Sequence, residues 1–337
     1  MKEFTYTRAA DTGSVLAALA ERPGVALLAG GTELLNWLKE GIEAPDHLID
    51  IGGLPLYDIE ETADGGLRIG ALQKMADVAR HPDVVRRFPA LARSLLLAAS
   101  PQLRNMATLG GNLQQRTRCP YFRAETGALP CNKRTPGSGC AALAAGAEDT
   151  TALFGWTEEC VATHPSDMAV ALAALDATVV VCGPGGTERR VPADAFHLTP
   201  QEAPVQRHTV LRDDELITAV EVPGTAWPSA YVKVRERASY EFALVSAAAL
   251  VDLADDGTLR AARVALGGVA HKPWVLDGIT PLVKGLRPAD TAALHAAVGP
   301  LFEEARPPAG EGFKADLARR ATVRALRDAA AVREGDR

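Results

Sequence analysis

Four of the five cysteines lie between residues 119 and 160, with the spacing Cys-x11-Cys-x8-Cys-x19-Cys. They are Cys119, Cys131, Cys140 and Cys160. No two of them have the short Cys-x2-Cys spacing that is typical of structural zinc sites. Long and irregular spacing suits an iron–sulfur cluster, around which a loop can wrap. A zinc ion held by all four thiolates, or four reduced and buried cysteines, are the alternative interpretations.

Cationic side chains accompany these cysteines, and positive charge stabilises thiolates. They are Arg116, Arg118, Lys133 and Arg134. The fifth cysteine, Cys182, lies in the apolar stretch VVVCG, where a thiol packs like a small hydrophobic side chain. We therefore expect four cysteines to act together and Cys182 to be structural.

A first Gly-Gly pair lies in residues 25–41, VALLAGGTELLNWLKEG. A short apolar strand precedes the pair and a helix follows, with Thr32 as the expected N-cap and Gly41 as the end of the helix. Free N–H groups at such a turn can bind an anion, although a plain strand-to-helix connection has the same pattern. The turn matches neither GxGxxG nor the P-loop pattern, which disfavours a nicotinamide-binding Rossmann domain and a nucleoside triphosphatase.

A second Gly-Gly pair lies in TLGGN, residues 108–112, where backbone can also approach a ligand closely. Together the two turns supply about the number of donors that a dinucleotide pyrophosphate needs. Ser166 is the expected N-cap of a following helix, and Asp167 either supports that helix end or accepts a hydrogen bond from a hydroxyl group. His164 is interpreted as a loop residue, not as a ligand.

The sequence contains no nucleophile–base pair and no HExxH motif, so no residue of this chain is predicted to be catalytic. These observations favour a chain that binds redox cofactors. Short strands and helices alternate as far as residues 225–228, and several strands followed by helices come after that point. This order predicts an α+β protein with two or three subdomains, the last containing an antiparallel sheet.

Composition excludes other classes of function. The 337 residues include 47% hydrophobic and 23% charged residues, and the net charge of −6 favours neither a nucleic-acid partner nor an anionic membrane. No apolar run reaches the length of a membrane span, and the N-terminus lacks the apolar core of a signal peptide. We therefore expect a cytoplasmic protein, or a periplasmic one that is exported with a signal-bearing partner.

Several motifs along the chain together resemble one family. They are LLAGGTELL with HLIDI, QLRNMATLGGNLQQRTRCPYF, PCNKRTPGSGCAAL, CVATHPSDMAVAL, YVKVRERASYEFALVSAAAL, VALGGVAHKPW and FKADLARRATVRAL. The chain resembles the FAD-binding medium subunit of the xanthine dehydrogenase group of molybdenum hydroxylases. It is most similar to the branch of bacterial periplasmic aldehyde oxidoreductases, which, like 4-hydroxybenzoyl-CoA reductase, has an extra [4Fe–4S] loop in this subunit.

The resemblance implies a fold and a set of domains. The fold is the two-subdomain FAD-binding type shared with vanillyl-alcohol oxidase, followed by an α+β domain of the CO-dehydrogenase flavoprotein C-terminal type. The expected domains are residues 1–55, residues 56–224 with the [4Fe–4S] loop at about 114–163, and residues 228–333.

The resemblance also implies two sets of site residues. The expected cluster ligands are Cys119, Cys131, Cys140 and Cys160. The expected FAD contacts are Ala26, Leu27, Leu28, Ala29, Gly30, Gly31, Thr32, Glu33, Leu34, Thr108, Gly111, Asn112, Asp167, Ile217 and Lys233.

The implied activity belongs to a three-subunit complex. A large molybdenum subunit hydroxylates an aldehyde, a small subunit with [2Fe–2S] clusters carries the electrons, and FAD in this chain passes them to an external acceptor. The alternatives are a hydroxybenzoyl-CoA reductase-type subunit that passes electrons inward, a subunit of a xanthine or N-heterocycle dehydrogenase, and a nucleotide-binding scaffold held together by zinc.

Overall fold

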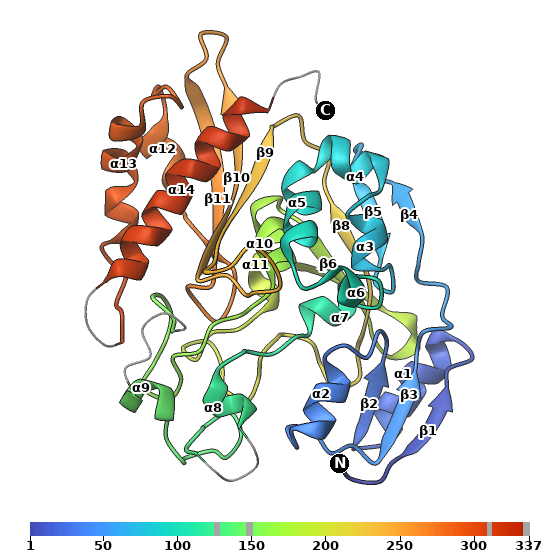
Figure 1. Ribbon diagram of the computed structural model, residues 1–337. Coiled ribbons are helices and arrows are strands. Elements are labelled where there is room, and N and C mark those ends of the chain that lie inside the picture. Colours follow the sequence, from blue (N-terminus) through green and yellow to red (C-terminus); the bar gives the residue numbers. More distant parts are fainter. Residues whose placement is uncertain (125–128, 146–150, 309–311, 333–337) are drawn as a thin grey trace.

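Three β-sheets organise the computed structural model, which describes residues 1–124, 129–145, 151–308 and 312–332 (Figure 1). The first sheet is parallel, with strand order β1-β3-β2. Its strands and helices are β1 (Thr5–Arg8), α1 (Thr12–Glu21), β2 (Val25–Leu28), α2 (Leu34–Lys39) and β3 (His47–Asp50). The strand–turn–helix prediction for residues 25–41 is confirmed, but Glu33, not Thr32, occupies the N-cap position of α2.

The second sheet is antiparallel, with five strands in the order β4-β5-β8-β6-β7. The strands are β4 (Ile59–Glu61), β5 (Leu67–Gly70), β6 (Thr178–Cys182), β7 (Glu188–Pro192) and β8 (Leu216–Val222). Its helices are α3 (Met75–Val78), α4 (Pro82–Arg87), α5 (Pro89–Leu97), α6 (Pro101–Arg104), α7 (Leu109–Leu113), α10 (Asp167–Ala174), the 3-10 turn η1 (Pro184–Gly186) and α11 (Ala193–Phe196). Every residue of α10 is buried, and the Ser166 hydroxyl caps this helix by accepting from the N–H of Ala169 at 3.0 Å, as predicted.

The third sheet is antiparallel, with strand order β12-β11-β10-β9. Its elements are β9 (Ser229–Val234), β10 (Val245–Leu253), β11 (Leu259–Gly267), β12 (Trp274–Val275), α12 (Ile279–Val283), α13 (Thr291–Val298), η2 (Gly299–Phe302) and α14 (Phe313–Ala331). Helix α14 lies along this sheet, and its apolar residues, such as Leu326, form a core with the inward side chains of β10 and β11 (Figure 1). The antiparallel unit after residue 228 is therefore confirmed, and residue 333 lies outside the described residues.

The cysteine-bearing stretch runs outside the three sheets, between α7 and α10 (Figure 1). It contains two short helices, α8 (Pro120–Arg123) and α9 (Ala141–Ala145). Residues 125–128 and 146–150 of the expected loop lie outside the described residues. The later part of the stretch contacts the segment that follows β11, since the N–H of Leu153 donates to the carbonyl of Val269 at 2.7 Å.

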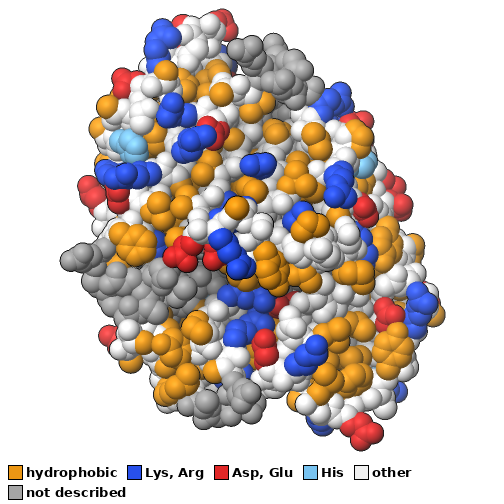
Figure 2. All heavy atoms as spheres, viewed as in Figure 1, with side chains coloured by type: hydrophobic (Ala, Val, Ile, Leu, Met, Phe, Trp, Pro, Cys, Tyr) orange, Lys and Arg blue, Asp and Glu red, His pale blue; other side chains and the backbone are white. Residues whose placement is uncertain are grey.

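Basic side chains gather on the face drawn in Figure 2, where the lower right part of the molecule meets the rest. Within the described ranges, none of the helices combines the length and the apolar character that crossing a membrane requires.

Candidate functional site

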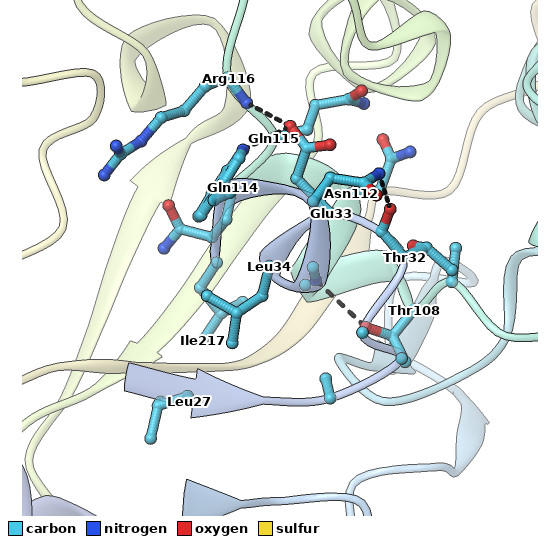
Figure 3. Close-up of a pocket in the computed structure, with 18 of the residues that line it drawn as sticks. Leu27, Thr32, Glu33, Leu34, Thr108, Asn112, Gln114, Gln115, Arg116 and Ile217 are labelled. Carbon is cyan, nitrogen blue, oxygen red and sulfur yellow. Dashed lines mark hydrogen bonds between the residues drawn. The ribbon is translucent and has the colours of Figure 1, made fainter. Parts of the chain in front are cut away.

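A large cavity of about 1130 Å³ lies between the first sheet and the second. It exceeds the roughly 300–1,000 Å³ of most small-molecule sites, so it can hold an extended ligand. The turn between β2 and α2, helix α7, the start of α10, strand β8 and the loop between β9 and β10 all contribute to its lining (Figure 3).

The turn between β2 and α2 presents free backbone donors to this cavity. Gly31 has a φ of 72°, a conformation that glycine adopts without strain. Gly30 packs against residues 106–107, because a Cβ there would lie 2.1 Å from the carbonyl oxygen of Met106. The backbone N–H groups from Gly30 to Leu34 have no acceptor among the residues that the structure describes. Unpaired N–H groups at a cavity wall are suited to binding the oxygens of an anion.

The second glycine pair differs from its prediction as a phosphate-binding turn. Residues 109–113 form helix α7, and its amides are already paired within the chain. The N–H of Gly111 donates to the Thr108 hydroxyl at 3.2 Å, and the N–H of Gly110 donates to the carbonyl of Ala71 at 2.8 Å. This segment therefore contributes side chains and close backbone packing to the cavity, but not the free amides that the sequence suggested.

Asp167 lies at the cavity wall and is held by two side chains from β9. The Tyr231 hydroxyl donates to one carboxylate oxygen at 2.5 Å, and the Lys233 ammonium donates to the other at 2.8 Å. Burial raises the pKa of Asp167, and Lys233 acts in the opposite direction. Burial also raises the pKa of Tyr231, so its hydroxyl stays protonated and acts as a donor. Ser166, not Asp167, caps the helix.

The cavity brings together thirteen of the fifteen residues expected to contact FAD. The two that do not line it are Leu28 and Lys233, and Lys233 acts on the cavity only through Asp167. Sequence reasoning missed other lining residues, among them Gln114, Gln115, Arg116, Arg118, His208, Tyr240 and Phe242. The glutamines and arginines follow directly after the motif that begins at Thr108, and the two aromatic residues lie within YVKVRERASYEF. Including the residues next to each motif would therefore have identified these six side chains.

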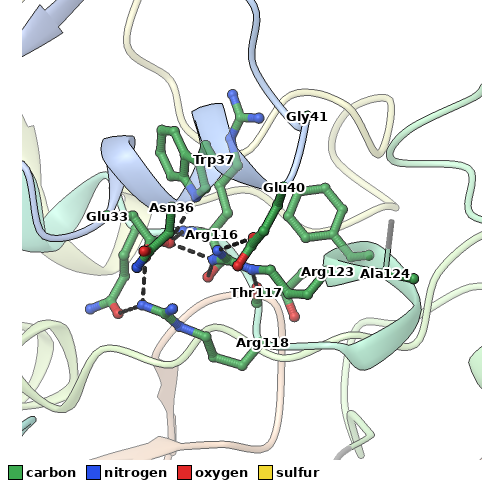
Figure 4. A network of polar contacts seen from close by, with 12 residues as sticks. Glu33, Asn36, Trp37, Glu40, Gly41, Arg116, Thr117, Arg118, Arg123 and Ala124 are labelled. Atoms are coloured by element: carbon green, nitrogen blue, oxygen red, sulfur yellow. Dashed lines mark hydrogen bonds and ion pairs between the residues drawn. The ribbon is translucent and has the colours of Figure 1, made fainter. Parts of the chain in front are cut away.

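Glu33 links the first glycine turn to the cysteine-bearing stretch (Figure 4). Its carboxylate forms ion pairs with Arg118 at 2.7 Å and with Arg123 at 2.5 Å, and it accepts from the backbone N–H of Arg116 at 3.3 Å. Arg123 also pairs with Glu40 at 3.1 Å. The side chain of Glu33 is mostly buried, so these pairs are protected from solvent and fix α2 against α8.

The four clustered cysteines line one small pocket of about 10 Å³, here called the cysteine pocket. Cys131 and Cys140 also face each other in an isolated β-bridge. Burial raises the pKa of Cys160 to about 11 and raises that of Cys119, so these thiols would stay protonated unless a cation stabilised their charge. In the described part of the chain, no group of three or more His, Cys, Asp or Glu side chains has the spacing to hold a single metal ion. Cys182 is buried in a different core cluster, with Val15 and Leu216.

Four histidines interact electrostatically with one another, and one of them, His208, lines the large cavity. They are His164, His197, His208 and His271. The rings of His164 and His197 are 4.0 Å apart between centroids, and Nε2 of His197 donates to the carbonyl of Leu113 at 2.8 Å. Burial lowers the pKa of His197 to about 4 and that of His208 to about 2, so both rings are neutral at neutral pH.

Comparison with protein families matches nearly the whole chain. Residues 2–225 match the FAD binding domain in molybdopterin dehydrogenase, and residues 230–329 match the CO dehydrogenase flavoprotein C-terminal domain. The free amides and most of the cavity lining thus lie within a domain whose family binds FAD, and the loop between β9 and β10 adds lining residues from the second match.

Individual relatives agree with these matches. The chain is 47% identical to the aldehyde oxidoreductase FAD-binding subunit PaoB of Escherichia coli strain K12, over 98% of this chain and 99% of the relative. It is 29% identical to the carbon monoxide dehydrogenase medium chain of Hydrogenophaga pseudoflava, over 96% of each. A solved structure of carbon monoxide dehydrogenase from that organism covers 97% of each chain at 26% identity, with a TM-score of 0.73. The α+β fold and the expected family are thereby confirmed: the chain belongs to the FAD-binding medium subunits of the molybdenum hydroxylases, a group of oxidoreductases.

Proposed function

We propose that this chain is the electron-transfer subunit of an aldehyde oxidoreductase, and that it carries FAD in the large cavity and a [4Fe–4S] cluster in the cysteine pocket. The observation that carries the proposal is the convergence of Cys119, Cys131, Cys140 and Cys160 on one pocket beside the large cavity. The donor set fits a cluster, because it consists of four thiols and thiolates are the usual ligands of iron–sulfur clusters. The similarity to the aldehyde oxidoreductase subunit PaoB supports the substrate class.

The residues of the large cavity have separate roles in this proposal. The free N–H groups of residues 30–34 bind the pyrophosphate of FAD, and the Thr108 hydroxyl and the Asn112 amide lie on the same wall. The buried Asp167 presents a fixed carboxylate, oriented by Tyr231 and Lys233. Ile217, on β8, supplies apolar surface. When bound, FAD exchanges electrons between one-electron and two-electron carriers, which is the chemistry that an electron-transfer subunit requires.

The proposal includes partners and domain boundaries. A large subunit with the molybdenum cofactor and a small subunit with [2Fe–2S] clusters complete the enzyme, and electrons leave through this chain to an external acceptor. Residues 1–55, 56–224 and 228–333 are the proposed domains, and the three sheets support this division.

The test is to tag this chain, express it with its neighbouring genes and characterise what co-purifies. The expected result is a complex with two further subunits, flavin bands in the visible spectrum and a broad absorption from iron–sulfur clusters. Iron and sulfide analysis of this chain, separated from its partners, should give four of each per FAD. A tagged chain that emerges alone and oxidises aldehydes unaided would overturn the electron-transfer role. Zinc in place of iron would contradict the assignment of a [4Fe–4S] cluster to the cysteine pocket.

A further inference from the structure

The cysteine pocket and the large cavity share a thin polar wall. Asn132 and Lys133 line the cysteine pocket, and Gln206 and His208 line the large cavity. The two pairs are in contact, since the Gln206 side chain donates to the carbonyl of Asn132 at 2.5 Å and the Lys133 ammonium lies 3.5 Å from Nδ1 of His208. These two contacts join the lining of the cysteine pocket to that of the large cavity.

Lys133 is the one cation among the described residues that line the cysteine pocket. Its ammonium donates to the carbonyl of Val205 at 2.9 Å and faces His208, but it has no carboxylate within ion-pair distance in the described part of the chain. Glu159 also lines the pocket, yet it is exposed and does not pair with Lys133.

The neighbouring arginines already have partners. Arg116 pairs with Glu43 at 2.5 Å, and Arg118 and Arg123 pair with Glu33. Arg134 donates to backbone carbonyls, including those of Phe122 and Gly41, and does not line the pocket. A partly buried cation without a counter-ion costs free energy. The ammonium of Lys133 can therefore be compensated by negative charge inside the cysteine pocket.

We propose that Lys133 is the charge-compensating residue of the cysteine pocket, and that His208 positions its ammonium from the side of the large cavity. This inference rests on the proposed function, because the charge to be balanced is that of a thiolate-bound cluster. Reduction adds one negative charge to the cluster, so a fixed positive charge beside it favours the reduced form and raises its midpoint potential. His208 accepts from the ammonium through Nδ1 and so determines where that charge lies.

The test compares variants of the purified complex by EPR-monitored redox titration, which reads the potential of each cluster separately from turnover. We expect Lys133→Met to keep its iron and to lower the midpoint potential of this chain's cluster. Lys133→Arg should restore the potential, and His208→Leu should lower it by a smaller amount. Lys272→Met is the matched control, because Lys272 already pairs with Glu202 at 2.6 Å, and its cluster potential should not change.

The outcomes separate this inference from the proposed function. Wild-type protein without iron in this chain would contradict the proposed function itself, before any variant is compared. Lys133→Met with full iron and an unchanged potential would overturn the role of Lys133. If Lys133→Met loses iron, recovery of both iron and potential in Lys133→Arg supports the role of charge, and failure of that rescue contradicts it.

Discussion

Lys233 and Asp167 form an ion pair of 2.8 Å, in which only 1% of the lysine side chain and 4% of the aspartate side chain are exposed. Asp167 lines the large cavity, whereas Lys233 does not. Strand β9 thus holds the carboxylate at the start of helix α10 in a fixed place. The consequence for stability can be measured.

Lys233→Met should destabilise the protein by about 3–5 kcal/mol, because it leaves a buried carboxylate that must either stay charged without its partner or take up a proton. The double variant Asp167→Asn with Lys233→Met should regain most of the loss, since neither charge remains. Chemical denaturation of wild type and both variants measures this difference. A single variant as stable as the wild type would contradict the assignment.

Gly30→Ala should yield protein with little bound flavin. The new Cβ would lie 2.1 Å from the carbonyl oxygen of Met106, so the turn that carries the free amides must move. Gly31→Val should act similarly, because the φ of 72° strains a β-branched residue. The control is Gly299→Ala, where a Cβ meets no atom within 4 Å. The flavin-to-protein absorbance ratio measures the effect, and full flavin in both turn variants would refute the assignment of the pyrophosphate site.

Glu33→Gln should reduce the content of both flavin and iron. Its carboxylate belongs to the turn at the large cavity and also pairs with Arg118 and Arg123 on the cysteine-bearing stretch. A neutral amide weakens both buried pairs and leaves two arginines partly uncompensated. Glu61→Gln is the matched control, because Glu61 pairs with Arg87, is more exposed and lines neither the large cavity nor the cysteine pocket. Flavin and iron analysis of the same preparations will show whether the two losses occur together.

Four of the five cysteines should be required for iron binding, and the fifth should not. Serine at Cys119, Cys131, Cys140 or Cys160 should remove iron, since all four line the same pocket. Cys182→Ala should keep full iron and cost only about 1 kcal/mol of packing. Iron determination on each variant decides the ligand set. Normal iron in any of the four serine variants, or its loss in Cys182→Ala, would show that the set is wrong.

Acid should destabilise the protein between about pH 6.5 and pH 4, in part through His197. Its folded pKa of about 4 lies below the value of roughly 6.5 in an unfolded chain, so in this window the unfolded chain binds the proton and the folded protein does not. Stability is therefore complete above pH 6.5 and falls as the pH decreases, by up to about 3 kcal/mol for this residue. His197→Gln retains a donor for the carbonyl of Leu113 and removes the titration. Denaturation midpoints at pH 7.5 and pH 5 should differ less in this variant than in the wild type.

Local patterns predicted the elements of the fold well. The strand–glycine–helix pattern of residues 25–41 and the Ser166 cap have causes within a few residues, so the sequence alone reveals them. The pairing of the amides of α7 was missed, because their acceptors include the carbonyl of Ala71, which is distant in the sequence. The partnership of Glu33 with Arg123 was missed for the same reason. The contact between Lys133 and His208 could not be predicted either, because it depends on tertiary packing between residues that are distant in the sequence.

The cysteine-bearing stretch also couples cofactor insertion to the folding of the C-terminal core. Phe154 stacks on Trp274 with 5.0 Å between ring centroids, and Leu153 belongs to the core beneath α14. Cys160 follows a few residues later, and the N–H of Ala152 donates to the carbonyl of Val161 at 2.8 Å, which ties the two segments together. If the cysteine pocket holds the proposed cluster, a chain without iron would hold residues 152–160 less firmly, and Leu153 and Phe154 would pack less firmly in the C-terminal core. Cells short of iron should accumulate less of this subunit, and the deficit should come from proteolysis of the last third of the chain, not from reduced synthesis.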